Sequence, residues 1–336
     1  MPELPEVHTT VQGLNQKLKG KKIIDVWSGY NSPFYQDKRD IKNVHYFKNF
    51  RRAVSGAKFL KAERRGKNIL IHLSNGHTAL IHMKMTGHLL YGRYNFEKFG
   101  GNDAKNSGKN TTGFWRATDD GPLQNPRNQY IRLVFSLSDK KHLVFSDLRK
   151  FAKIFVFPTK ELALLPDIVG LGPEPMEKSF TYKKLKERLA RWPNRPIKQI
   201  LMDQSVIAGI GNIYSDEMLW ASGVHPVSAA SKIPEKNLKL LFKEMKFVLA
   251  RGIRFGGDSE SDYRNIDGES GKFQNKHHVY RHTGETCSRR ACGGTITRMK
   301  VGGRSAHFCP KHQKLFGKIG GENRQAIENR TRWTKP

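Results

Sequence analysis

The chain has 336 residues, which is long enough for two domains and a small additional module. Its 60 lysines and arginines outnumber its 30 acidic residues, and the formal net charge is +30. This excess favours a nucleic acid as partner over a membrane surface, and no apolar run is long enough to span a bilayer. Since the N-terminus also lacks a signal-peptide pattern, we expect a cytoplasmic protein. Charge alone leaves a DNA-binding enzyme and a basic ribosomal factor equally open.

The first half of the chain predicts one helix followed by many strands. Apolar residues recur at helical spacing from Val7 to Leu18. Residues 91–128 are rich in Gly, Asn, Lys and Thr without a period, and we expect a long inserted surface loop there. Residues 1–160 are therefore predicted to form a β-sandwich with flanking helices. The alternation typical of strands is found in residues 69–73, 79–85, 131–137 and 143–145.

The second half changes to a helical pattern after residue 170. An apolar stripe from Leu238 to Leu249 predicts a long amphipathic helix, and residues 170–265 are expected to form a helical domain. The polar, Gly-rich stretch 256–276 suggests a mobile loop, and residues 317–336 suggest a basic, poorly ordered tail. The fold class predicted for the whole chain is α+β multidomain.

All three cysteines lie in one C-terminal stretch with the spacing of a metal site. Cys287 and Cys292 are separated by four residues, and Cys309 and His312 follow as a second pair after sixteen more. Two pairs on tight turns can place four ligands around a zinc ion, and the intervening residues alternate like a short hairpin. We expect a β-hairpin zinc finger over residues 278–316 with one structural Zn²⁺; the alternative is three core cysteines beside an unrelated histidine. Arg304 at the hairpin turn is placed to reach DNA, or is simply solvated.

The N-terminus offers a nucleophile. Removal of Met1 leaves Pro2 with a free secondary amine, and α-amino groups titrate near pH 8, so part of the amine is neutral at pH 7. Such an amine can attack a sugar C1′ and form an iminium, with Glu3 beside it to transfer protons. By itself this signal is weak, because Glu3 and Glu6 also simply favour a helix N-terminus.

Several motifs occur in one order along the chain. They are residues 2–7 (PELPEV), 64–67 (RRGK), 82–87 (HMKMTG), 145–151 (FSDLRKF), 171–175 (LGPEP) and 209–214 (GIGNIY), followed by the finger. Together they resemble the formamidopyrimidine-DNA glycosylase and endonuclease VIII family, closest to its formamidopyrimidine-DNA glycosylase branch. The resemblance covers nearly the whole chain outside the expected loop and tail.

The resemblance implies a β-sandwich, a helix-two-turns-helix domain and a zinc finger, with a role for each matching residue. Pro2 would be the nucleophile, and Glu3 would act as the acid and the base. Lys67 and Arg304 would be cations of the catalytic site. The alternative for Lys67 is a solvated lysine at a strand edge. Lys198, Asn212 and Arg304 would hold DNA phosphates. Met85, Arg149 and Phe151 would fill the gap left by a base flipped out of the duplex. For Met85 and Phe151, periodicity alone favours core packing instead.

The implied activity is that of a bifunctional glycosylase and abasic-site lyase of base excision repair. Its substrates would be oxidised purines in double-stranded DNA, excised through a Schiff base and followed by β,δ-elimination. We expect a monomer, associated with the bacterial nucleoid. Oxidised pyrimidines are the alternative substrates, and a non-catalytic damaged-DNA-binding protein or a ribosome-associated RNA-binding protein are the alternative classes. His312 departs from the family pattern, which has a fourth cysteine at that place.

Overall fold

The computed structural model describes residues 1–98 and 113–317. The chain divides into two compact units. The N-terminal unit contains Met1–Val169 and Gly252–Gln274, and the C-terminal unit contains Gly170–Arg251 and the residues from Asn275 onward. The chain therefore returns to the N-terminal unit after residue 251, whereas the sequence suggested a helical domain running to residue 265.

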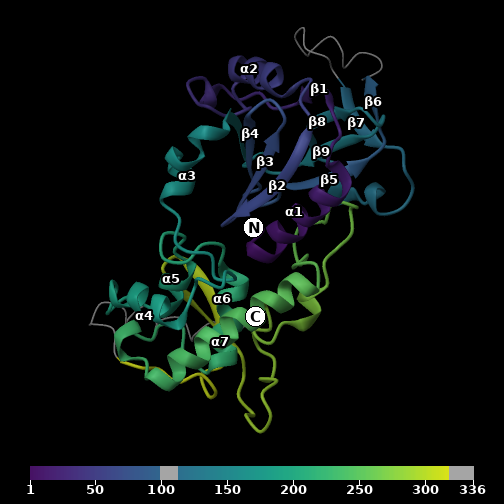
Figure 1. Ribbon diagram of the computed structural model, residues 1–336. Helices are drawn as coiled ribbons and strands as arrows, with labels where there is room; N and C mark the ends of the chain where they lie inside the picture. Colours follow the sequence, from purple (N-terminus) through teal and green to yellow (C-terminus); the bar gives the residue numbers. More distant parts are fainter. Residues whose placement is uncertain (99–112, 318–336) are drawn as a thin grey trace. The chain divides into compact units, whose positions relative to one another are not determined.

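The N-terminal unit contains two four-stranded antiparallel sheets that share one core, as predicted for a sandwich (Figure 1). One sheet has the order β1-β8-β9-β5 and the other the order β10-β4-β3-β2. Ile69 and Ile71 of one sheet lie in the same apolar cluster as Leu133 and Phe135 of the other. The strands are β1 (Ile23–Ser28), β2 (Phe59–Arg65), β3 (Asn68–Leu73), β4 (His77–His82), β5 (His88–Gly92), β8 (Ile131–Leu137), β9 (His142–Ser146) and β10 (Lys153–Pro158).

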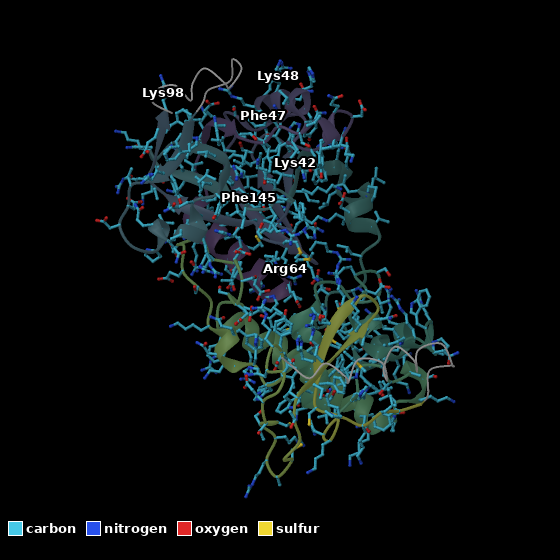
Figure 2. All side chains as sticks on the ribbon, turned by 180° about the vertical axis from the view of Figure 1, so that it is seen from behind. Lys42, Phe47, Lys48, Arg64, Lys98 and Phe145 are labelled. Atoms are coloured by element: carbon cyan, nitrogen blue, oxygen red, sulfur yellow. The ribbon has the colours of Figure 1, made fainter. Side chains whose placement is uncertain are left out.

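Helices flank the sandwich. Helix α1 (Leu4–Leu18) packs against β2 and β3 through its apolar face, of which Val7 and Leu14 are buried. Helix α2 (Val44–Val54) begins at Asn43, whose side chain accepts hydrogen bonds from the first backbone N–H groups and so satisfies the helix end. The short segments are η1 (Pro33–Tyr35), η5 (Thr159–Leu164) and α3 (Pro166–Val169). In Figure 2, Phe145 lies inside this unit, whereas Lys48 and Lys98 lie at its surface.

The expectation of an unstructured loop over residues 91–128 is wrong for the part that the structure describes. Strands β6 (Tyr94–Lys98) and β7 (Gly113–Ala117) pair in antiparallel register, with Phe96 opposite Trp115. Two single turns follow, η3 (Pro122–Gln124) and η4 (Pro126–Asn128). Each strand has only five residues, so the aromatic alternation is too short to stand out in a Gly- and Asn-rich segment.

The C-terminal unit is helical, as predicted, and ends in a hairpin. The apolar stripe of helix α7 (Glu235–Arg254) is buried, with Leu241, Met245 and Leu249 fully inaccessible. The elements are α4 (Tyr182–Ala190), α5 (Ile197–Met202), α6 (Asn212–Ser222), η6 (Ala230–Lys232), α7 (Glu235–Arg254, the last turn of which leads back to the N-terminal unit), η7 (Phe273–Lys276), β11 (Thr297–Val301) and β12 (Arg304–Phe308). Almost all of the expected basic tail lies outside the described residues.

The segment after α7 packs against the N-terminal unit and does not project as a loop, which differs from the mobile loop expected over residues 256–276. Tyr263, Ile266 and Phe273 are buried. The Ser259 hydroxyl donates to the Tyr263 carbonyl (2.7 Å) and accepts from the Gly271 N–H (2.8 Å). Within the described ranges, none of the helices has the length and hydropathy that crossing a bilayer requires.

Candidate active site and metal centre

Pro2 and Glu3 lie at the N-terminal end of α1, and both are buried. Glu3 is the N-cap residue of this helix. Its backbone N–H donates to Glu6 Oε2 (2.7 Å), while its own carboxylate accepts from the N–H of Glu6, which forms a reciprocal capping box. The capping box fixes the backbone on the C-terminal side of Pro2, so the first residues are held in one place.

Glu6 is a site residue that the sequence analysis treated only as a favourable helix charge. Its carboxylate is buried, and Oε1 accepts from the N–H of Asp258 (2.7 Å). The Tyr263 hydroxyl donates to the Glu6 carbonyl (3.0 Å). Gly257 has φ +85°, and a Cβ there would lie 2.9 Å from the Glu6 side chain. Glu6 therefore joins the N-terminus to the 252–274 segment, a contact between residues too far apart in sequence for a local motif to reveal.

Lys67 lies in the turn between β2 and β3 and is nearly buried. Burial, together with the positive charges of Lys84 and Lys67, lowers the pKa of His82 to about 3. His82 is therefore neutral at physiological pH. Lys67 supplies positive charge close to the turn that follows β4, where Met85 lies.

The three predicted gap-filling residues lie on two turns that are hydrogen-bonded to each other. Met85 is half-buried, whereas Arg149 and Phe151 are exposed, and the Arg149 guanidinium lies 4.6 Å from the centre of the Phe151 ring. Thr86, next to Met85, accepts from the Arg149 N–H (3.1 Å). Because the Phe151 ring is 49% exposed, core packing does not explain it.

Asp147 positions these two turns, and the sequence analysis missed it. Its carboxylate is fully buried and accepts hydrogen bonds from the Thr86 hydroxyl (2.6 Å), the Tyr30 hydroxyl (3.0 Å) and the Ala152 N–H (3.0 Å). The available signal was an acidic residue directly after the buried strand β9 in the 145–151 motif. A carboxylate that accepts several hydrogen bonds is typical of a positioning residue.

In the C-terminal unit, the side chain of Lys198 contacts the first turn of α6. Its side chain is fully buried, and its ammonium pairs with Asp216, donates to the Ser215 hydroxyl (3.3 Å) and lies 3.5 Å from the Asn212 carbonyl. Gly211 is the N-cap of α6 and Asn212 its first residue. The structure thus brings Lys198 and Asn212 together at the N-terminus of α6, where the Lys198 ammonium is fully buried and paired with the Asp216 carboxylate.

Arg304 begins β12, after a turn in which Gly302 and Gly303 have φ values of +55° and +76°. Its side chain is exposed. The strand is tied to α6, because Asp216 Oδ2 accepts from the backbone N–H of His307 (3.0 Å) and lies 3.0 Å from its Nδ1. The same Asp216 carboxylate therefore holds both Lys198 and the strand that carries Arg304.

The three cysteines form one cluster, with their sulfur atoms within 4.8 Å of one another. The Trp220 indole N–H donates to Cys287 Sγ (3.4 Å). His312 lies outside this sulfur cluster, and its Nε2 donates to the Trp220 carbonyl (2.7 Å). Clustered sulfur ligands on two turns suit Zn²⁺, which prefers thiolate and imidazole donors. The hydrogen bond at Nε2 leaves Nδ1 as the ring nitrogen that can bind a metal.

The sandwich with its fixed Pro-Glu terminus, the exposed residues on its turns, and the cysteine hairpin define a DNA-processing protein with a zinc finger. The chain belongs to the formamidopyrimidine-DNA glycosylase family. Residues 1–154 match the model of the formamidopyrimidine-DNA glycosylase N-terminal domain, residues 171–264 match its H2TH domain, and residues 284–311 match the zinc finger found in FPG and IleRS.

Relatives and solved structures support this assignment over almost the whole chain. The formamidopyrimidine-DNA glycosylase of Pelotomaculum thermopropionicum is 34% identical over 94% of this chain and 100% of its own length. The Bacillus subtilis protein of the same name is 35% identical over 93% and 99%. The structure is similar to Lactococcus lactis Fpg in complex with DNA containing an abasic site, with a TM-score of 0.73, 29% identity, and coverage of 93% and 99%.

Proposed function

We propose that this protein is a bifunctional DNA glycosylase and abasic-site lyase that removes oxidised purines in base excision repair. The observation that carries the proposal is the Pro2-Glu3 pair held in place at the start of α1. Relatives carry the corresponding name, and similar structures hold Fpg with DNA containing an abasic site or an N7-benzyl-Fapy-dG lesion. Because these relatives are bacterial, we place the activity on chromosomal DNA in the bacterial cytoplasm.

The chemistry begins once Met1 has been removed, because only then does Pro2 carry a free amine. The amine nitrogen attacks C1′ of the damaged nucleotide, the bond from C1′ to the base breaks, and the base leaves with a proton. Glu3 protonates the opening sugar at its ring oxygen. The resulting iminium acidifies the C2′ proton, so that elimination releases the 3′ phosphate and a second elimination releases the 5′ phosphate.

The remaining residues hold the DNA around the flipped nucleotide. A base inside a duplex must leave the stack before C1′ can be attacked, and the gap must be filled. Met85 and Phe151 are the apolar fillers, and Arg149 hydrogen-bonds the orphaned base. Phosphates on the damaged strand are bound by the cations and the amide predicted above: Lys67, Lys198, Asn212 and Arg304.

The zinc ion would be held by Cys287, Cys292 and Cys309, with His312 as the proposed fourth ligand through Nδ1. Such a closed site contributes folding free energy to the hairpin that carries Arg304 and takes no part in the reaction. Zinc content of the purified protein tests the ligand set. We expect one zinc per chain, faster loss to a chelator in His312→Ala, and recovery in His312→Cys; equal loss rates in all three proteins would remove His312 from the set.

Borohydride trapping tests the nucleophile. The untagged protein is incubated with duplexes that contain 8-oxoguanine opposite cytosine, and in parallel with thymine glycol. We expect a covalent adduct, faster with 8-oxoguanine, that is lost when a tag blocks the N-terminus. A tagged protein that nicks normally contradicts the mechanism. Faster reaction with thymine glycol assigns oxidised pyrimidines instead, and tight binding without any adduct indicates a non-catalytic damaged-DNA-binding protein.

A further inference from the structure

Lys42 is a buried lysine to which the mechanism proposed above assigns no task. It lies between β1 and α2, and its side chain is only 4% exposed. In Figure 2, Lys42 lies within the N-terminal unit, as Phe145 does. Lysines are almost never buried to this degree unless their charge is paired, because desolvation of an ammonium group costs free energy. The contacts of this side chain therefore indicate what its burial achieves.

Three groups surround the Lys42 ammonium. Its Nζ lies 3.6 Å from Asp40 Oδ2 and 4.1 Å from the centre of the Tyr35 ring. The carboxylate, itself buried, and the face of the ring compensate the positive charge. The ammonium also donates a hydrogen bond to the Ala152 carbonyl. This bond has a different consequence, since it connects the segment before α2 to a residue 110 positions later in the chain.

Ala152 is the last residue of the gap-filling turn (residues 147–152) and directly follows Phe151. Its N–H donates to Asp147 Oδ2 (3.0 Å), and its carbonyl accepts from Lys42. Ala152 is buried, and hydrogen bonds to charged groups in such surroundings are stronger than those between neutral groups at the surface. Both polar groups of the Ala152 backbone are thus fixed by buried charges, so the end of the turn cannot shift without breaking one of these bonds.

The gap-filling turn contains a strained residue. Lys150, between Arg149 and Phe151, has φ +55°, a left-handed conformation that residues other than glycine rarely adopt. Such a conformation persists only where surrounding contacts impose it. Since Arg149 and Phe151 are exposed, the packing of their own side chains contributes little to this restraint. The buried contacts of Ala152 and Asp147 supply it.

We propose that Lys42 is a positioning residue that holds the gap-filling turn in the shape in which Phe151 and Arg149 enter the duplex. Lys42 acts through Ala152, because its ammonium is too deeply buried to reach DNA. Without this hydrogen bond the turn samples other conformations, and insertion into the gap becomes slower. The inference rests on the gap-filling role proposed above.

Insertion into DNA can be measured without any cleavage. The full-length protein is mixed in a stopped-flow instrument with a duplex that carries 2-aminopurine opposite a tetrahydrofuran analogue of an abasic site. The fluorescence of 2-aminopurine depends on stacking, so it changes when side chains enter the gap beside it. Lys42→Met keeps the length of the side chain and removes the donor. We expect insertion to be about tenfold slower, the factor that one hydrogen bond to a charged group is worth.

Lys38→Met is the matched control for this change. The Lys38 ammonium lies over the same Tyr35 ring (4.7 Å from its centre), but the Lys38 side chain is exposed. We expect Lys38→Met to insert at the wild-type rate. The double variant Asp40→Asn/Lys42→Met removes both charges and leaves no unpaired carboxylate in the core, so it keeps the test valid if Lys42→Met folds poorly. It should insert as slowly as Lys42→Met.

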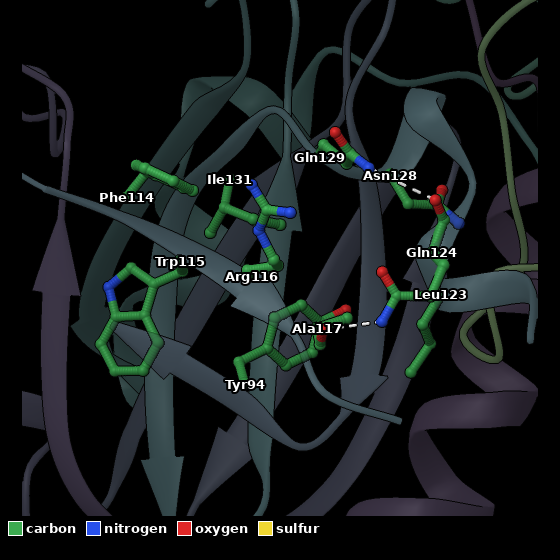
Figure 3. A pocket seen from close by; sticks show the side chains of 10 residues that line it. All are labelled: Tyr94, Phe114, Trp115, Arg116, Ala117, Leu123, Gln124, Asn128, Gln129 and Ile131. Carbon is green, nitrogen blue, oxygen red and sulfur yellow. Dashed lines mark hydrogen bonds between the residues drawn. The ribbon is translucent and has the colours of Figure 1, made fainter. Parts of the chain in front are cut away.

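Tyr30 supports the same turn from the same segment, and it offers a milder variant. Its buried hydroxyl donates to Asp147 Oδ2 (3.0 Å). Tyr30→Phe removes this bond alone, so we expect severalfold slower insertion. Tyr94, which lines the pocket drawn in Figure 3, is also buried, and its hydroxyl has no hydrogen-bond partner among the residues that the structure describes. Tyr94→Phe is therefore the matched control and should insert like wild type.

Borohydride trapping on single-stranded abasic DNA separates positioning from a general loss of structure, because a single strand has no gap to fill. We expect Lys42→Met to trap at the wild-type rate. In a Phe151→Ala background, Lys42→Met should slow insertion less than it does in wild type, since both changes affect one turn. Wild-type insertion in both Lys42 variants, full additivity with Phe151→Ala, or an equal loss of trapping and insertion overturns the inference.

The two proposals fail in distinguishable ways. Insertion by the wild-type protein without trapping would refute the proposed catalysis alone, because the 2-aminopurine signal needs no reaction. Trapping together with insertion that does not depend on Lys42 would refute this inference alone.

Discussion

A single carboxylate, that of Asp147, determines how the exposed residues of the 147–151 turn are presented. It accepts hydrogen bonds from Thr86 on one turn and from Ala152 at the end of the other. Thr86 in turn holds the Arg149 backbone. Because the carboxylate is buried, each bond is made away from competing water and is stronger than at the surface. The exposed tip can therefore carry residues that contribute little to stability.

This arrangement predicts opposite behaviour for two phenylalanines in the same motif. Phe145 is fully buried, so Phe145→Ala should lower the free energy of unfolding by about 3–5 kcal/mol. Phe151 is half exposed, so Phe151→Ala should leave stability almost unchanged but lower the rate of 8-oxoguanine excision at least about tenfold, because the ring that we propose fills the gap is lost. Urea unfolding and single-turnover kinetics separate the two effects. A Phe151→Ala protein with the wild-type excision rate would remove this residue from the gap-filling set.

At the scale of elements, buried carboxylates connect helix α6 to the finger. Asp216 binds β12 through His307, and Glu217 accepts the backbone N–H groups of His278, Val279 and Tyr280. These three residues lie just before the first cysteine pair. Adjacent side chains of one helix thus hold both ends of the metal-binding hairpin, although the helix itself supplies no metal ligand.

Glu217→Gln should therefore destabilise the finger. Glutamine offers only one acceptor oxygen and no charge, so three backbone N–H donors, of which that of Val279 is fully buried, compete for a weaker partner, at a cost of about 1–3 kcal/mol. We expect a lower melting temperature and faster zinc release to a chromogenic chelator. Glu187→Gln, a change on the exposed side of α4, is the control and should behave as wild type. Equal zinc release in Glu217→Gln and wild type would show that this carboxylate does not support the metal site.

Elements with a sustained period could be predicted from the sequence, and long-range contacts could not. Alternation of apolar residues predicted the sandwich strands, and helical spacing predicted the apolar stripe of α7. The spacing of the metal ligands predicted the cysteine hairpin. The β6–β7 hairpin did not, because five-residue strands beside a polar segment carry too little signal. The pairing of Glu6 with Asp258 joins the two ends of the N-terminal unit, and only tertiary structure specifies it.

At the scale of the whole molecule, buried histidines set the lower pH limit of stability. His88 is 1% exposed, and burial lowers its pKa to about 4, although hydrogen bonds to the Thr86 carbonyl and the Asn128 side chain act in the opposite direction. In the unfolded chain the pKa of histidine is about 6.5. The unfolded state therefore takes up this proton first as the pH falls, and the folded state loses relative stability.

The contribution of His88 is thus complete above about pH 6.5 and declines as the pH falls towards about 4, by an amount on the order of 3 kcal/mol. His82, with a pKa of about 3, adds a loss of the same sign. Unfolding free energies measured by urea titration between pH 7.5 and pH 4.5 should show this decline. In His88→Gln, which cannot titrate, the curve should be flatter over that range even if the variant is less stable at pH 7.5. Parallel curves for the two proteins would mean that the folded state takes up the His88 proton over the same pH range as the unfolded chain, so that burial does not lower the pKa of His88.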